Sequence, residues 1–112
     1  MTHGIEPQTG DDGALAVAQS RSDSTVSLHL WGELDMATQE QVENALLRAE
    51  DSDATVIELD FGGLTFMDSS GVHVAVDAQR RASEKGHTLV LLEGSEMVQR
   101  VFALTGTDGL FG

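Results

Sequence analysis

The sequence contains no cysteine, a single proline and a single tryptophan, and only six Lys and Arg residues against nineteen Asp and Glu. Without cysteine there is no disulfide framework, no thiolate nucleophile and no cysteine-ligated metal site. The net charge of −13 argues against nucleic acid and anionic membrane as partners, because no basic stripe is present to neutralise phosphates. The same charge fits a basic protein partner or simple solubility. No apolar run is long enough to span a bilayer and the N-terminus lacks a secretory pattern, so we expect a cytoplasmic protein.

The length and apolar content are those of one small domain. With 112 residues, of which 40% are hydrophobic and only 4% aromatic, the chain can build a single core, mainly from Val, Leu, Ala and Ile. Phe61, Phe66 and Phe102 are expected to be its large members. Residues 1–13 are polar and contain Pro7, and they predict a flexible N-terminal tail.

Hydrophobic periodicity predicts alternating strands and helices. The expected strands are 14–19, 25–31, 56–61 and 88–93, and the expected helices begin at Thr38, Ser69 and Ser95. The first two strands, joined by the turn-rich segment 20–24, form an antiparallel hairpin, and the later strand–helix–strand crossovers favour parallel pairing. Alternation in the second and third strands predicts one well-covered face. The fold class is therefore α/β, with a mixed sheet of about four strands and helices mainly on one face.

The helix ends carry recognisable signals. Thr38 and Gln41 match a capping box, the helix from Ser69 is expected to end at about Lys85 before Gly86, and Gly106 closes the last helix. The inward-facing residues are expected to be Val42, Ala45, Leu46 and Ala49 in the first helix and Met97, Val98, Val101 and Phe102 in the last.

The segment Phe66–His73 is the most informative part of the chain. It follows the third strand and a short turn at Gly62-Gly63, and it opens onto a helix. Ser69 and Ser70 thus lie in the first helical turn, where free N–H groups and the positive end of the helix dipole accommodate a phosphate. A serine so placed is either part of a helix start capped by Asp68 or a residue that becomes modified. The residues alone favour the cap.

Two segments, Gly32–Asp35 and Leu64–Val72, resemble the bacterial anti-sigma-factor antagonists, the family that defines the STAS domain. The resemblance runs from about Ala14 to Phe111, and the family's order of elements matches the order predicted from periodicity. Asp-Ser-Ser-Gly alone is a weak signal, but it is a strong one in register with Leu-x-Phe-Met and the upstream Gly-Glu-Leu-Asp. The family usually continues past Gly-Leu-Phe into a further edge strand and a helix. The resemblance therefore implies a STAS domain over residues 14–112 without those two elements.

The resemblance also implies a function by partner switching. In the family, the serine directly after the aspartate, here Ser69, is phosphorylated by an anti-sigma factor that is also a serine kinase. The unphosphorylated antagonist binds that anti-sigma factor and releases the sigma factor, the phosphorylated form lets go, and a serine phosphatase restores binding. The implied protein is no enzyme and needs no cofactor. Its docking surface would consist of Asp35, Asp68, Ser69, Ser70 and Gly71.

Simpler interpretations stand beside these. Asp35 is either a docking residue or a loop carboxylate near Thr38, and Gly71 allows the helix to approach the sheet closely. His73 lies one turn from Ser69, but no nucleophile elbow or orienting acid accompanies it, so it is expected on the helix surface. The remaining histidines and the tryptophan carry no site signal. We expect His3, His29 and His87 to face solvent without a metal, and Trp31 to pack against a neighbour or the tail rather than to bind a partner.

Two other function classes remain open. One is a binding module of the same fold that senses a small ligand or joins a larger signalling complex. The other is a receiver domain that accepts phosphate on an aspartate such as Asp60. A receiver needs clustered acids and a lysine on a later strand, and the only lysine, Lys85, ends a helix. The receiver is therefore the least favoured class.

Overall fold

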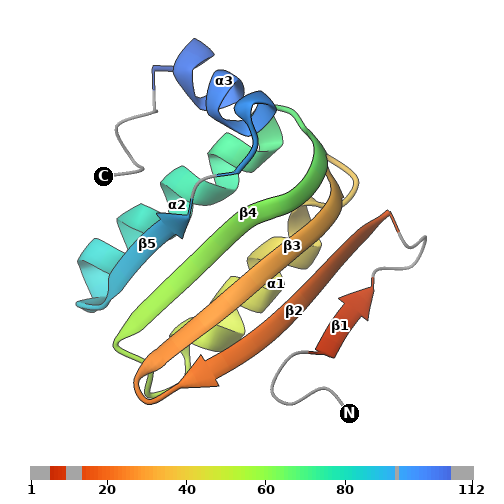
Figure 1. Ribbon diagram of the computed structural model, residues 1–112. Helices are drawn as coiled ribbons and strands as arrows, with labels where there is room; N and C mark the ends of the chain where they lie inside the picture. Colours follow the sequence, from red (N-terminus) through yellow and green to blue (C-terminus); the bar gives the residue numbers. More distant parts are fainter. Residues whose placement is uncertain (1–5, 10–13, 93, 107–112) are drawn as a thin grey trace.

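The computed structural model describes residues 6–9, 14–92 and 94–106. Within these residues, one sheet has the strand order β1-β2-β3-β4-β5 (Figure 1). Strands β1, β2 and β3 are antiparallel neighbours, and β3, β4 and β5 run parallel. The elements are β1 (Glu6–Thr9), β2 (Leu15–Ser22), β3 (Thr25–Leu34), α1 (Gln39–Glu50), β4 (Val56–Met67), α2 (Ser69–Lys85), β5 (Thr88–Leu92) and α3 (Glu96–Leu104). The predicted α/β class and mixed sheet are confirmed.

Strand β1 lies in the segment predicted as a flexible tail. Glu6–Thr9 pair with residues 16–19 of β2 and add a fifth strand to the four predicted. The segment has no alternating apolar pattern, and a proline in a run argues against a central strand, but an edge strand tolerates one. Its backbone pairs with the open edge that β2 presents. Residues 1–5, 10–13, 93 and 107–112 lie outside the described residues, as do the predictions that fall on them.

Strand β4 is longer than predicted. It continues through Gly62 and Gly63 to Met67, so the turn expected at the two glycines is wrong. Instead, the pairing of β4 with β3 shifts register between His29 and Trp31 and again between Gly32 and Glu33. The glycines thus mark shifts of register in the sheet, which is another common use of glycine within a strand.

The hairpin between β2 and β3 is also tighter than predicted. Its turn is reduced to Asp23 and Ser24, because the strands extend to Ser22 and resume at Thr25. Asp23 adopts a positive φ of 53°, which two-residue hairpin turns require and aspartate tolerates. The expected segment 20–24 therefore holds the turn but is mostly strand.

Helices α1 and α2 cover one face of the sheet, and α3 packs near the end of β4 (Figure 1). The covered face holds the core, in which Phe61 of β4 contacts Phe102 of α3 edge to face at 5.7 Å between ring centres. The inward residues predicted for α1 are buried, as are Val98 and Phe102 of α3, while Met97 and Val101 pack partly buried against the core. The prediction for Phe66 is wrong, because its side chain is 46% exposed. Pairing of β4 with β3 is irregular just before Phe66, so strict alternation is lost and the buried residues here are Leu64 and Met67.

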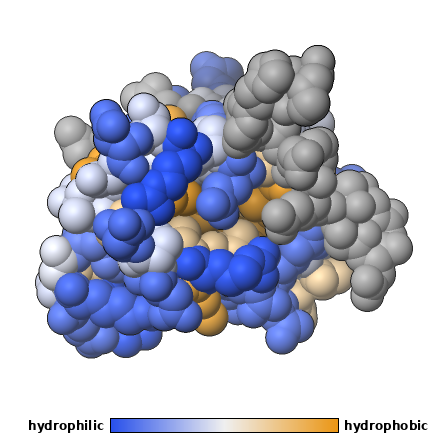
Figure 2. All heavy atoms as spheres, turned by 90° about the horizontal axis from the view of Figure 1, so that it is seen from below, coloured by the Kyte–Doolittle hydropathy of each residue, from blue (hydrophilic) through white to orange (hydrophobic). Residues whose placement is uncertain are grey.

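The two ends of the sheet differ in surface character. Figure 2 views the end where β4 begins and α2 terminates, and hydrophilic residues cover most of it, with small hydrophobic areas between them. The carboxyl ends of β3 and β4 lie at the opposite end, where Met36 is 82% exposed.

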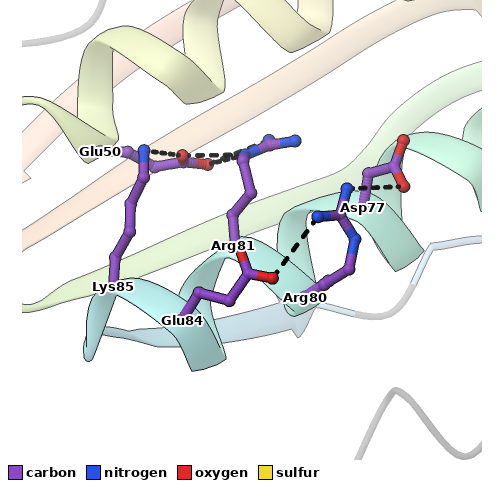
Figure 3. A network of polar contacts seen from close by, with 6 residues as sticks. All are labelled: Glu50, Asp77, Arg80, Arg81, Glu84 and Lys85. Carbon is purple, nitrogen blue, oxygen red and sulfur yellow. Dashed lines mark hydrogen bonds and ion pairs between the residues drawn. The ribbon is translucent and has the colours of Figure 1, made fainter.

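A buried ion network joins α1 to α2 (Figure 3). Glu50, with a side chain only 1% exposed, accepts hydrogen bonds from Arg81 Nε at 2.9 Å and Lys85 Nζ at 2.9 Å. Burial raises the pKa of Glu50, but the hydrogen bonds from Arg81 and Lys85 outweigh it, and the pKa lies below its ordinary value. The hydrogen bond with Glu50 likewise raises the pKa of Arg81. Glu50 and Arg81 therefore stay charged, and their ion pairs hold α1 against α2.

We expect Glu50→Gln to lower the free energy of unfolding at neutral pH by about 1–3 kcal/mol, because the two cations lose the charge that they share. Since the pKa of Glu50 is depressed on folding, its contribution is complete above about pH 4.5, the ordinary pKa, and is lost as the pH falls through the folded-state pKa. Urea titrations should therefore show a difference from wild type that shrinks in acid.

The matched control is Asp53→Asn, which removes an exposed ion pair with Arg21. It should leave the urea midpoint unchanged, since exposed pairs contribute little. If Glu50→Gln lowers the free energy of unfolding equally at neutral and acid pH, the stabilisation does not come from the charge of Glu50.

Candidate functional site

The site lies where β3 and β4 end side by side. Leu34 and Met67 are register partners in these parallel strands, so Asp35 and Asp68 emerge as neighbours. The backbone N–H of Asp68 donates to the carbonyl of Leu34 at 3.2 Å and ties the two strand exits together. The structure thus brings together the two acids that the sequence singles out.

Asp68 is the N-cap of α2. Its Oδ1 accepts a hydrogen bond from the N–H of Ser70 at 2.8 Å, with the backbone of Asp68 extended at φ −111° and ψ −165°. Ser69 is the first helical residue and is exposed, while Ser70 is half-buried. Within the described part of the chain, the Ser69 hydroxyl makes no hydrogen bond. Capping is therefore the role of Asp68, and the Ser69 oxygen is left accessible.

Gly71 brings the start of α2 close to the sheet. It is buried, and a Cβ at this position would overlap the side chain of Met67 and stand 3.1 Å from Cδ2 of Leu34. The expectation that Gly71 permits close approach is confirmed. Its proximity to a docking partner stays a prediction, as do the docking roles of Asp35, Asp68, Ser69 and Ser70.

Asp35 organises the turn that leads into α1. Its Oδ1 accepts hydrogen bonds from the N–H groups of Ala37 at 2.9 Å and Thr38 at 3.2 Å. Thr38, although it precedes α1, makes no side-chain cap, so the capping-box prediction is wrong. Its hydroxyl instead donates to the carbonyl of Glu33 at 2.8 Å, and Gln41 donates to the carbonyl of Leu15 at 3.0 Å. Asp35 therefore organises the turn before the helix, and the choice between a loop carboxylate and a docking residue stays open.

Two apolar side chains accompany these acids at the surface. Met36 is 82% exposed in the turn after β3, and Phe66 is 46% exposed near the end of β4. Met36 has no signal in the sequence beyond an apolar residue within a polar turn. Glu33, also exposed, adds a third carboxylate near Asp35 and Asp68. The site therefore combines a free hydroxyl, negative charge and uncovered apolar area.

The sequence predicts that the histidines face solvent, and this prediction is right for His73 but wrong for His29 and His87. His73 is exposed on α2, as predicted. His29 does not simply face solvent, because its ring nitrogens lie 3.2 Å from Ser20 Oγ and 3.2 Å from Asp60 Oδ2. His87 is also partly buried, and its Nε2 is enclosed without a hydrogen-bond partner among the described residues. His3 lies outside those residues.

The described residues form neither a metal cluster nor a membrane-spanning helix. Among residues 6–9, 14–92 and 94–106, no three His, Asp or Glu side chains are grouped so that they could hold a metal ion. No helix formed by those residues combines the length and apolarity needed to cross a bilayer. Asp60 bonds to His29 and to the N–H of Gly62, while Lys85 pairs with Glu50, so the arrangement that a receiver needs is not formed.

Residues 17–112 match the family model described as Mlab, STAS domain. The chain belongs to the STAS domain family. An anti-sigma F factor antagonist of Lysinibacillus sphaericus is 34% identical to this STAS domain over 83 residues, which are 73% of this chain and 71% of that protein. The predicted family resemblance is confirmed.

Solved structures give the same result. The anti-sigma factor antagonist SpoIIAA in its unphosphorylated form matches this STAS domain with a TM-score of 0.73 at 31% identity, over 85% of this chain and 84% of that one. The Bacillus cell fate determinant SpoIIAA in its phosphorylated form matches with a TM-score of 0.67 at 31% identity, over 85% and 87%. The fold described here is therefore shared with antagonists solved in both states.

Asp35 offers a test of how the site is built. We expect Asp35→Ala to lower the free energy of unfolding by about 1 kcal/mol, since it removes the acceptor of two backbone N–H groups. Asp35→Asn keeps an acceptor oxygen and should stay within about 0.5 kcal/mol of wild type. Urea unfolding measures both variants, and equal losses for Ala and Asn would contradict the hydrogen-bonding role.

Proposed function

We propose that this STAS domain is an anti-sigma factor antagonist whose binding is switched by phosphorylation of Ser69. In the unphosphorylated state it binds an anti-sigma factor that is also a serine kinase, and so releases a sigma factor. The phosphorylated state lets the partner go until a serine phosphatase removes the phosphate. The STAS domain itself catalyses nothing, needs no cofactor and acts in the cytoplasm with its partners.

The observation that carries this proposal is the accessible Ser69 hydroxyl on a helix start that is already capped. Because Asp68 supplies the cap, a phosphate on Ser69 breaks no hydrogen bond of the described structure. The N-terminal N–H groups of α2 tolerate the added negative charge within the protein. Phosphorylation is therefore compatible with the fold, and the relatives named as antagonists support the same use of the site.

The effect of the phosphate is instead to weaken binding of the partner protein. The phosphate adds about −1.5 to −2 charges beside Asp68, and a surface fitted to a hydroxyl would have to desolvate a dianion. Loss of about 3 kcal/mol weakens binding by roughly a hundredfold. A small local change of charge thus suffices to separate two proteins without unfolding either.

A ligand-sensing module of the same fold is the second candidate. The observation that favours it is a shallow pocket of about 330 Å³ between the second half of α2 and the start of β5, lined by polar residues that include His87 and by the apolar Ala82 and Leu89. The enclosed Nε2 of His87 lacks a partner among the described residues. The pocket is far along α2 from Ser69, so the two functions are separable.

The decisive experiment incubates the protein with a candidate anti-sigma factor kinase and ATP, then maps the phosphate by mass spectrometry. We expect one acid-stable phosphate on Ser69. Ser69→Ala should abolish incorporation, whereas the matched control Ser83→Ala, an exposed serine in the second half of the same helix, should retain it.

Each alternative has its own outcome. An acid-labile phosphate on Asp60 would indicate a receiver. No incorporation with any anti-sigma factor kinase encoded beside the protein would reject the switch and leave the ligand-sensing module.

A further inference from the structure

The single tryptophan of the chain is exposed on the face of the sheet that the helices leave uncovered. Trp31 belongs to the β3 residues that alternate with the buried Leu28, Leu30 and Leu34, and its side chain is 41% exposed. The sequence predicts that it packs against a neighbour or the tail rather than binding a partner. It does contact neighbours, but 41% of it remains in contact with water.

The indole is held in place although it is not buried. It stacks on His29 with 6.3 Å between ring centres and 25° between planes. His29 is itself positioned by Ser20 and Asp60, each at 3.2 Å from one ring nitrogen. The indole also lies against Gly63, where any Cβ would overlap its Cδ1 atom. A side chain ordered before binding loses less entropy when a partner covers it.

A second exposed aromatic lies on the neighbouring strand. Phe66 of β4 is the register partner of Glu33, which stands two residues after Trp31 on β3. We call Trp31 and Phe66 together the aromatic ledge. Trp31 lies opposite Gly63 on β4, Phe66 stands three residues after Gly63, and Ser69 stands three residues after Phe66. By contrast, the end of the sheet viewed in Figure 2, where β4 begins, is mostly hydrophilic.

The ledge is within reach of a partner docked at Ser69. Trp31 precedes the end of β3 by three residues, which is about 10 Å of strand. A standard interface covers roughly 800 Å² on each protein, which corresponds to a patch about 30 Å across. One partner can therefore cover the strand ends and the ledge at the same time.

Charge indicates what kind of surface fits. Glu33 is the register partner of Phe66, and Asp60 bonds to His29, on which Trp31 stacks, so acidic residues neighbour both aromatics on a chain with a net charge of −13. An apolar pocket surrounded by basic side chains complements an aromatic with an acidic rim.

We infer that the anti-sigma factor docks on the aromatic ledge as well as on the Ser69 loop, and that Trp31 is an anchor of this interface. The inference rests on the proposed function and adds to it a surface outside the phosphorylation loop. Tryptophan is among the residues that most often carry binding energy. Phosphorylation of Ser69 would then release the ledge together with the loop.

The test uses the full chain with its one tryptophan replaced by 5-fluorotryptophan, and a kinase already shown to phosphorylate Ser69. Titration without ATP should shift or broaden the single ¹⁹F resonance, and phosphorylated protein should keep the free resonance. Trp31→Ala should weaken binding about 10- to 100-fold. The matched control is Leu47→Ala on α1, a site 42% exposed, and it should bind like wild type.

Urea unfolding shows whether Trp31→Ala and a second variant, Trp31→Phe, are folded. Trp31→Phe keeps an aromatic ring and should bind more tightly than Trp31→Ala. If the kinase binds and phosphorylates the protein while the ¹⁹F resonance stays unchanged and Trp31→Ala binds like wild type, the ledge lies outside the interface and the proposed function stands. If no anti-sigma factor kinase that phosphorylates Ser69 is found, the proposed function and the inference fail together.

Discussion

The pairing of β3 with β4 is the constraint on which the rest of the site depends. Because Leu34 lies opposite Met67 in a parallel ladder, the chain leaves both strands at the same level of the sheet. One exit becomes the turn held by Asp35, and the other becomes the start of α2 capped by Asp68. A slip of this ladder by one residue would separate the two acids and turn the inward side chains outward.

The structure divides its tasks between the two ends of the sheet. At one end, the buried Glu50 network joins α1 to α2 through charged hydrogen bonds. At the other end, polar groups are bonded within short turns, and the Ser69 hydroxyl is left to solvent. Stability and switching thus depend on different residues, so a modification at Ser69 need not disturb the helix pair.

Much of the fold could be predicted because local patterns and tertiary packing agree. The α2 helix, its Asp68 cap and its glycine stop all follow from spacing and capping chemistry. The errors lie where tertiary contacts override a local signal. Gly62 and Gly63 suggest a turn, but they admit irregular pairing with β3 and the indole of Trp31.

The candidate site was likewise predicted in part. The acids and Ser69 stand in a recognisable motif, so their segments could be located before the structure was known. The exposure of Met36 and Phe66 could not, because an apolar residue reads as core unless the register of its strand is known. The positioning of His29 between Ser20 and Asp60 also required the sheet, since these residues come from three strands.

The most direct test measures affinity and stability on the same sample of protein phosphorylated on Ser69. Calorimetric titration against the kinase should show binding roughly a hundredfold weaker than for the unphosphorylated protein. Urea unfolding of that sample should give a free energy within about 0.5 kcal/mol of the unphosphorylated value. Equal affinity in the two states, or weaker binding that appears only together with unfolding, would contradict a switch that acts at the surface.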